Sequence, residues 1–464
     1  MIKMAIKEII QNLPEVTPPS EKKVSFKVKL KWTLIILGAF FILLNIPLHG
    51  LSANALERFE FLAVILGTDF GSIVSLGIGP IVTASIILQL LVGSGVLSID
   101  TKTEEGKKLF QGIQKIGVIF FIIFEAFVYV LMQGLQAAPG YAWLVILQLI
   151  LGGFAIMFMD EVSAKWGFGS GVSLFILAGV SLQVFVGLFQ FIGTDGSNCL
   201  ANFSGIPCAG RVLVIIQSFI NGDPTGALLA FVVIGVTILI FLGVVWAQAL
   251  KVEIPLSYDR LRGYGVKWPL AFFYASVIPV ILVAALAANV QLFGGLLQSW
   301  LGHPTIIGGF SQGVPISGLA YWLSSSNLVE SIITGSLQRA QIGQAVVHTL
   351  FYMIFSMIFS IFWVKTSGMD ASSQAKNIMS SGLQLPGFRK DERVLESVLN
   401  RYVMPLTVMG GLAIGLLASI ADLLGAITSG TAILLAIMIA HQMYTNIAKQ
   451  HAVDMHPALR KIMA

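Results

Sequence analysis

Long apolar runs, separated by short polar stretches, make up most of this sequence of 464 residues. Each run approaches the roughly 20 residues that an α-helix needs to cross a membrane. The runs are continuous, whereas the strands of a membrane barrel alternate apolar and polar residues. Ten runs can be marked, at residues 32–50, 72–93, 112–133, 140–159, 172–193, 226–249, 269–292, 343–364, 403–424 and 430–448. We therefore predict an all-α integral membrane protein with ten transmembrane helices.

The first residues follow a different pattern. Apolar side chains recur there at a helical spacing, at Ile2, Ile6, Ile9, Ile10 and Leu13, with lysines between them. Such an amphipathic helix lies in the membrane interface rather than crossing it. We expect residues 1–31 to stay outside the membrane and to begin with this helix.

The positive charges fall almost wholly on one side of this layout. The two termini and every second loop hold 25 of the 28 lysines and arginines, which leaves Arg58, Arg211 and Arg339 for the other side. Because cytoplasmic loops are enriched in lysine and arginine, both termini should be cytoplasmic. A wrong number of spans would scramble this asymmetry, so the charge distribution also favours ten.

Ten spans divide into two sets of five, and the second set would be inverted in the membrane relative to the first. Inverted repeats commonly hold the functional site at their interface. The predicted parts are a cytoplasmic segment 1–31, a first half 32–193, an external loop 194–225, a second half 226–448 and a cytoplasmic tail 449–464. Two long cytoplasmic loops, 250–268 and 365–402, belong to the second half.

Composition supports the membrane assignment. Apolar residues make up 56% of the chain and charged residues 11%, with a mean hydropathy of +0.87. Soluble domains carry about 25% charged residues, so a soluble, disordered or nucleic-acid-binding protein is excluded. The two cysteines are too few for an iron–sulfur site, and the six histidines are scattered, so we expect no metal or other cofactor. Whether Cys199 and Cys208 form a disulfide is left open, because nine positions of separation say nothing about geometry.

Few ionisable residues fall inside the predicted spans. Glu125 lies in the middle of the third span, and His348 and Asp422 lie towards the external ends of theirs. Ion-coupled transporters use such groups for relays and ion sites, so their scarcity argues against a secondary transporter of a small solute. That transporter remains the alternative function, and a membrane scaffold or insertase without an aqueous path is a third. We interpret Glu125 as a hydrogen-bonded contact between helices, because an unpaired buried carboxyl is costly.

Two neighbouring segments carry more specific information. The second span contains Pro80, which removes a backbone donor and should bend the helix. Upstream, residues 54–66 are too short to span and too apolar for a free loop. Asn54, with Glu57 three positions later, resembles a capping box that starts a helix. We predict a half-helix folded back into the protein, because lipid-exposed irregular backbone is not tolerated. An external surface helix is the alternative.

Seven separated motifs together resemble one family. They are LGIGPIVTASIILQLLVGSG (76–95), LFQGIQK (109–115), FGSGVSLFI (168–176), KVEIPL (251–256), IPVILVAAL (278–286), GFRKDER (387–393) and RYVMPLTVMGG (401–411). In this order they are similar to SecY, the large subunit of the protein-conducting channel, in its archaeal form. The resemblance runs through nearly the whole chain.

The resemblance implies two five-helix halves around a central pore that conducts unfolded polypeptides and releases transmembrane segments sideways into lipid. It places an aliphatic constriction, the pore ring, at Ile78, Val82, Val172, Ile176, Ile281 and Leu435. An apolar constriction can gate by dewetting and offers no fixed charge to passing side chains. Periodicity alone would assign the same six residues to an ordinary apolar core.

The resemblance also implies moving parts. The half-helix matches the plug of the family, which sits outside the ring, and its residues here would include Asn54, Leu56, Phe59, Phe61, Leu62 and Ile65. A sideways opening, the lateral gate, would be held shut by a polar cluster of Thr83, Gln114 and Asn289.

Partners follow from the same resemblance. The cytoplasmic loops would dock the translating ribosome through Arg260, Arg262, Arg389 and Lys390, since a cationic surface fits the phosphates of ribosomal RNA. The small membrane subunits SecE and Secβ, nascent chains and membrane lipid would be the other partners. We expect a channel in the cell membrane and not an enzyme.

Overall fold

A computed structural model describes most of the chain. The described residues are 13–20, 24–54, 56, 63, 67–97, 99, 103–193, 197–200, 208–258, 265–311, 314–380, 383–384 and 391–455. Eight helices within them are long and apolar enough to cross a membrane. These are α5 (Glu104–Leu131), α6 (Ala142–Trp166), α7 (Gly171–Phe189), α9 (Pro224–Ala249), α10 (Ile278–Leu301), α13 (Arg339–Thr366), α15 (Glu392–Leu424) and α16 (Gly430–Met455). The protein is therefore a multi-helix membrane protein.

Two further helices lie at the first two predicted spans. The first, α2 (Phe26–Leu44), carries three lysines near its start, and the second, α4 (Gly79–Gly93), has only 15 residues. Helix α15 begins eleven residues before the predicted 403, and α16 continues past the predicted 448. The predicted amphipathic helix runs from Ile2 to Leu13, and all of it except Leu13 lies outside the described residues.

Helix α4 differs from its prediction in two ways. It starts at Gly79 rather than at residue 72, because residues 71–78 form successive turns. Pro80 occupies its first turn, where a missing backbone N–H leaves no bond unmade. The predicted bend was therefore wrong: Pro80 begins this helix instead of bending it.

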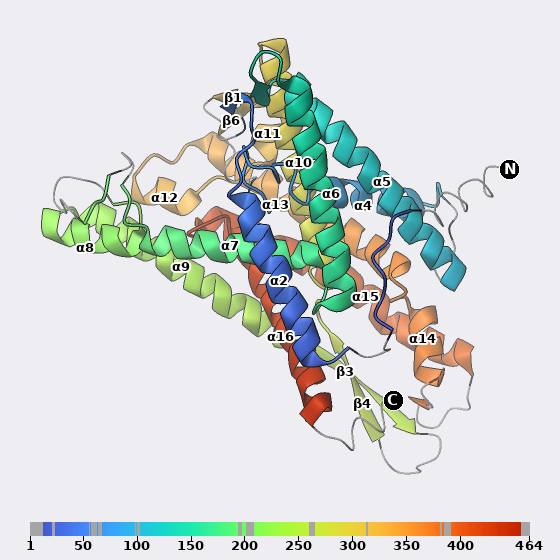
Figure 1. Cartoon of the computed structure of the whole chain (residues 1–464). Coiled ribbons are helices and arrows are strands. Elements are labelled where there is room, and N and C mark those ends of the chain that lie inside the picture. The colour runs from blue at the N-terminus through green and yellow to red at the C-terminus, as the bar shows by residue number, and fades with distance from the viewer. Residues whose placement is uncertain are drawn as a thin grey trace.

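Helix α10 starts at Ile278, nine residues later than predicted. The preceding residues form a strand, β4 (Gly265–Ala271), that pairs antiparallel with β3 (Lys251–Tyr258), and β7 (Leu383–Gln384) pairs with the other edge of β3. Apolar residues alternate along β4, so they resembled the start of a span. The hairpin and α14 (Ala371–Ser380) project at one end of the molecule (Figure 1).

Short elements collect at the opposite end of the molecule (Figure 1). Two small sheets form there, one from β1 (Leu51–Asn54) and β2 (Leu135–Ala137), the other from β5 (Gly309–Ser311) and β6 (Val314–Ser317). Three short helices are α8 (Arg211–Asn221), α11 (Gly318–Leu323) and α12 (Leu328–Ile333). Cys199 and Cys208 form a disulfide before α8. The protein is thus mainly, but not purely, α-helical.

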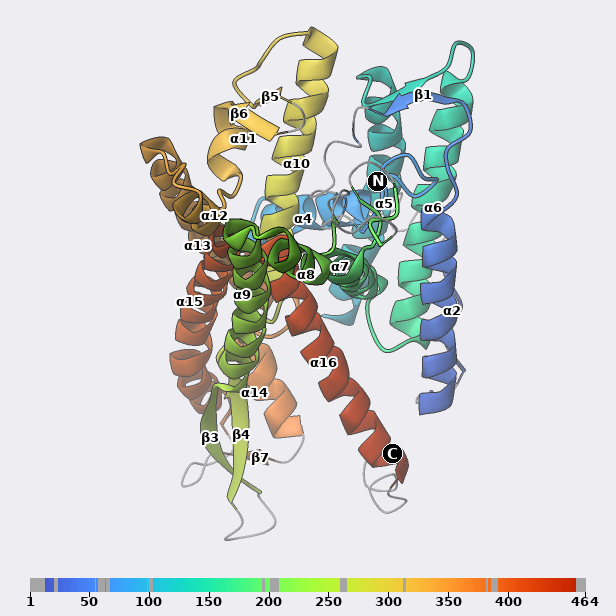
Figure 2. The same cartoon turned by 90° about the vertical axis from the view of Figure 1, so that its left-hand side faces the viewer.

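The two predicted halves meet along two lines of contact. In Figure 2, α2, α5 and α6 lie on one side, and α9, α10, α13 and α15 lie on the other. On one line, which we call the α4 seam, α4 packs against α10 and α13. On the other, the α16 seam, α16 packs against α7 and α2. One large apolar cluster runs through both halves between these seams.

Candidate functional site

A hydrogen bond crosses the α4 seam. The Nδ2 group of Asn289, on α10, donates to Thr83 Oγ1, on α4, over 3.0 Å. The carboxyl group of Glu125, which projects from α5 and is 2% exposed, lies near the Thr83 hydroxyl. Three helices thus meet at one group of polar side chains, the buried Thr83 and Glu125 and the half-buried Asn289, which we call the seam cluster.

Gln114 does not join the seam cluster. Its Nε2 group donates to Ser85 Oγ over 2.7 Å, which ties α5 to α4 within the first half. With 3.6 residues per turn, Ser85 points about 200° away from Thr83 around α4 and so faces away from Asn289. In this structure Gln114 thus bonds Ser85 rather than Thr83, and Glu125 is the α5 side chain near Thr83; the part of Gln114 in a gate stays a prediction. The sequence carried a signal for Glu125, since it is the one carboxyl in the predicted span 112–133 and lies near its middle.

The six predicted ring residues lie in one apolar cluster that draws on both halves. Ile78 and Val82 come from the start of α4, Val172 and Ile176 from α7, Ile281 from α10 and Leu435 from α16. Five of them are buried, and Val172 is partly buried and packs against the same cluster.

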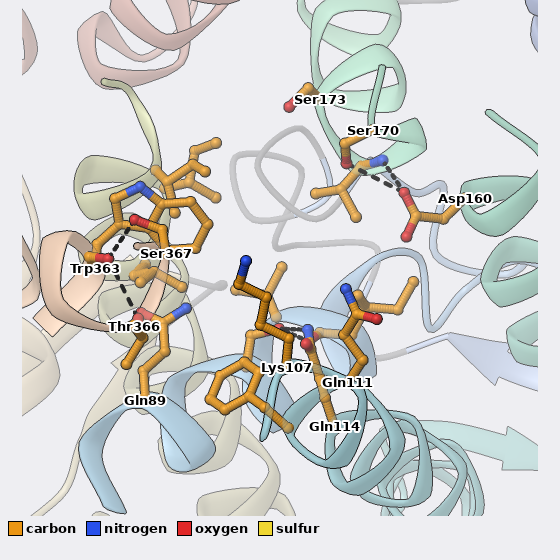
Figure 3. A pocket seen from close by; sticks show the side chains of 18 residues that line it. Gln89, Lys107, Gln111, Gln114, Asp160, Ser170, Ser173, Trp363, Thr366 and Ser367 are labelled. Carbon is orange, nitrogen blue, oxygen red and sulfur yellow. Dashed lines mark hydrogen bonds between the residues drawn. The ribbon is translucent and has the colours of Figure 1, made fainter. Parts of the chain in front are cut away.

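A cavity of about 380 Å³ opens beside these residues (Figure 3). Its apolar wall includes Val82, Val172 and Ile281. Most other lining groups are polar and uncharged: Ser85, Gln89, Gln111, Gln114, Ser170, Ser173, Thr366 and Ser367. Asp160 lies at its edge, where one oxygen accepts the Val172 N–H over 2.9 Å and caps α7 (Figure 3). Such a lining suits a water-filled space next to an apolar constriction.

The segment of the predicted plug is described only in part. Asn54 ends β1, and its Oδ1 accepts the N–H of Leu56 over 3.1 Å. Glu57, the other member of the predicted capping box, lies outside the described residues. Leu56 is 1% exposed, which fits a segment folded back into the protein. Phe59, Phe61, Leu62 and Ile65 lie outside the described residues. At the far end, Gly67 lies close to Phe175, beside the ring residue Ile176.

Comparison with known proteins decides the family. The SecY family profile matches residues 72–444. The chain is 41% identical to the protein translocase subunit SecY of Methanothermobacter thermautotrophicus, with 100% of this chain and 99% of the relative aligned. It is 40% identical to the SecY of Methanocaldococcus jannaschii, with 98% of each chain aligned. The chain belongs to the SecY family. The resemblance to archaeal SecY is confirmed.

Solved structures agree with this assignment. A protein-conducting channel matches at 38% identity with a TM-score of 0.81, over 97% of this chain and 98% of the other. Canine Sec61, from a ribosome–channel complex of the endoplasmic reticulum, matches at 37% identity with a TM-score of 0.78 over 97% and 98% of the two chains. These relatives of the SecY family support a channel rather than the alternative of a small-solute transporter.

The cationic residues predicted for this SecY-family protein to bind the ribosome, Arg260, Arg262, Arg389 and Lys390, lie outside the described residues. The base of the β3–β4 hairpin that leads to two of them is described. Lys267 bonds Glu253 across the strands over 2.7 Å, and this hydrogen bond raises the pKa of Lys267.

Behind the hairpin, the Tyr274 hydroxyl donates to the Met369 carbonyl over 2.6 Å. Burial, with a smaller contribution from nearby Asp370, raises the pKa of Tyr274 to about 12. The hydroxyl therefore keeps its proton, and with it this hydrogen bond, at any physiological pH. The link between the hairpin's base and the start of α14 is fixed in place.

A second buried pair was not foreseen from the sequence. His348 Nε2, on α13, lies 3.4 Å from Asp422 Oδ2, on α15, and both side chains are almost fully buried. The Nδ1 atom of His348 is 2.8 Å from the Leu323 carbonyl, and Asp422 Oδ1 accepts the Thr431 N–H over 2.7 Å. Four elements, α11, α13, α15 and α16, are thereby tied together. The two residues are 74 positions apart, so no local pattern could pair them.

Proposed function

We propose that this chain forms the pore of a protein translocase, conducting unfolded secretory polypeptides across the cell membrane and releasing transmembrane segments into lipid. The observation that carries this proposal is that Ile78, Val82, Val172, Ile176, Ile281 and Leu435 all belong to the apolar core shared by both halves, and that Val82, Val172 and Ile281 among them line the cavity. In this proposal α2 and α4 complete a set of ten spans arranged as two inverted halves.

The ring would act as a seal. Its side chains carry no charge and no hydrogen-bonding group, so they cannot prefer one passing side chain over another. Val82, Val172, Ile78, Ile176 and Ile281 are β-branched and stiff, which suits a gasket around a moving chain. The segment from Asn54 to residue 66 would serve as the plug on the external side.

The α4 seam would be the lateral gate. Its closure relies on the seam cluster, and polar pairs between membrane helices contribute about 0.6–2 kcal/mol. An apolar signal helix can replace that amount of stabilisation. The α16 seam would then be the hinge about which the halves separate.

Partners and orientation complete the proposal. Both termini and the β3–β4 hairpin would face the cytoplasm, where the loops 250–268 and 365–402 would bind a translating ribosome. SecE and Secβ would be the small membrane subunits. The chain would be no enzyme, and the driving force would come from its partners.

The test is site-specific photocrosslinking from a nascent chain held by a ribosome. Photoreactive residues replace Ile78 and Ile281 in the ring and, as a matched control, Leu147, which is 52% exposed on α6. We expect crosslinks at the two ring positions and none at Leu147. An engaged ribosome without ring crosslinks would mean that polypeptides take another route.

A further inference from the structure

Glu125 is a buried carboxyl group at the α4 seam. It is 2% exposed, and its Oε1 atom has no hydrogen-bond partner among the described residues. The carboxyl lies near the Thr83 hydroxyl, whose oxygen accepts from Asn289 across the seam. Glu125 is therefore next to the bond that joins the two halves.

Among the described residues, no cation faces this carboxyl from the elements around it. Helix α5 packs against α4, α6 and β2, and α4 packs against α10 and α13. On α13, Arg339 and Lys365 lie at the two ends, and His348 faces Asp422. Helices α4 and α10 and strand β2 contain no ionisable residue, and the charged residues of α6 lie in its last two turns. On α5 itself, Lys115 is ten residues away, about 15 Å along the helix, and bonds Glu161.

Tyr129, one turn further along α5, is the titratable group that faces Glu125, and its buried hydroxyl has no hydrogen-bond partner among the described residues either. Tyrosine is neutral at physiological pH and cannot balance a carboxylate. An isolated buried carboxylate is so costly that the group takes up a proton instead. In the closed seam Glu125 is therefore an uncharged carboxylic acid.

We propose that the seam cluster is a proton-binding site whose occupancy is linked to the lateral gate. The closed seam binds one proton at Glu125, and separation of α4 from α10 admits water and releases that proton. This inference rests on the proposed lateral opening. A proton bound in only one of two states shifts their ratio by up to about tenfold per pH unit. Because the closed state holds the proton, rising pH favours the open gate.

The experiment measures the gate distance as a function of pH. Spin labels replace Ile87 on α4 and Ile354 on α13, both exposed, and the two native cysteines are joined in a disulfide and do not react. The complete complex is placed in lipid nanodiscs with a synthetic signal peptide, made of a lysine-containing start and about twelve apolar residues.

Between about pH 6 and pH 9 we expect the open fraction of the wild type to rise by at least tenfold per two pH units. The Glu125→Gln variant keeps the shape of the side chain without a titrating proton and should lose this slope. Glu105→Gln, an exposed position on the same helix, is the matched control and should retain it.

Each failure has a distinct meaning. A peptide that opens the gate equally at every pH in the wild type would overturn the proton linkage and leave the proposed function standing. A peptide that never changes the distance would contradict the lateral gate itself. Should Glu125→Gln not assemble, infrared difference spectra of the wild type replace it. We expect the band of a protonated carboxyl to decrease when the peptide binds, and an unchanged band contradicts the proposal.

Discussion

At the scale of single residues, one hydrogen bond joins the two halves at the seam cluster. Replacing Asn289 by Leu removes the donor to Thr83 and leaves α10 apolar at that point. We expect the gate to shift towards the open state by about threefold to thirtyfold, as 0.6–2 kcal/mol implies. Translocation of substrates with weak signal sequences should rise accordingly.

The matched control for this change is Thr349→Val. Ser419 bonds Thr349 over 2.9 Å between α13 and α15, so this variant loses an interhelical hydrogen bond inside the second half only. It should leave weak signals unaffected. Equal translocation of weak signals by Asn289→Leu and the wild type would sink the assignment of the gate.

A second residue-scale prediction concerns His348 and Asp422. A carbonyl only accepts, so the Nδ1 atom beside Leu323 must carry a hydrogen. The Nε2 atom lies 3.4 Å from a carboxyl oxygen of Asp422. His348→Leu would strand Asp422 as a buried acid without its partner, and we expect a loss of about 3–5 kcal/mol in the free energy of unfolding.

The double variant His348→Leu/Asp422→Leu removes the stranded charge and should recover most of that loss. Thermal unfolding of the purified complex measures both variants. Should the double variant be as unstable as the single one, packing rather than charge would explain the effect.

At the scale of elements, close helix contacts depend on glycine. A Cβ atom at Gly415 of α15 would lie 2.5 Å from the Tyr352 carbonyl oxygen of α13, and the obstacle is backbone rather than a side chain that could turn away. We therefore expect Gly415→Ala to cost about 1–3 kcal/mol of unfolding free energy. Gly243→Ala on α9, where a Cβ meets nothing within 4 Å, is the control and should be neutral or slightly stabilising. Equal unfolding temperatures for the two variants would contradict this account.

The sequence predicted elements better than their ends. Apolar runs located every long helix, because burial in lipid demands a continuous apolar stretch. The predicted span at 269–292 began too early, because the end of strand β4 is apolar enough to resemble the start of a membrane helix. The exchange of Gln114 for Glu125 has a related cause. Which of two polar residues on α5 reaches Thr83 depends on helix rotation, and a pattern in one helix does not contain that angle.

At the scale of the whole molecule, long-range contacts decide the site. The ring draws on α4, α7, α10 and α16, and the two seams join helices that lie from about two hundred to nearly four hundred positions apart. No local pattern contains such contacts, and by periodicity the ring residues resemble any other core. Only the seven ordered motifs allowed the ring residues to be predicted as a site. That these residues line a working pore stays a prediction.

The cytoplasmic loops give the prediction that belongs to this scale. If Arg260 and Arg389 bind ribosomal RNA phosphates, affinity for the ribosome should fall steeply as salt rises. Each arginine replaced by alanine should lower the slope of log affinity against log salt by about one. Ribosome binding to proteoliposomes across a salt series measures this, with Arg211→Ala, an exposed position at the start of α8 outside both loops, as the control. Unchanged slopes would assign these arginines to membrane orientation alone.

The β3–β4 hairpin has a mechanical consequence. Seven paired positions make it a ribbon about 20 Å long, and only residues 272–277 separate it from α10. At its base the Tyr274 hydroxyl is hydrogen-bonded to the Met369 carbonyl, so we expect the ribbon to pivot about that bond. We expect a load on the ribbon to be passed on to the first turn of α10, which carries Ile281. A ribosome bound to the hairpin would in this way move the Ile281 side chain of the ring without any chemical reaction.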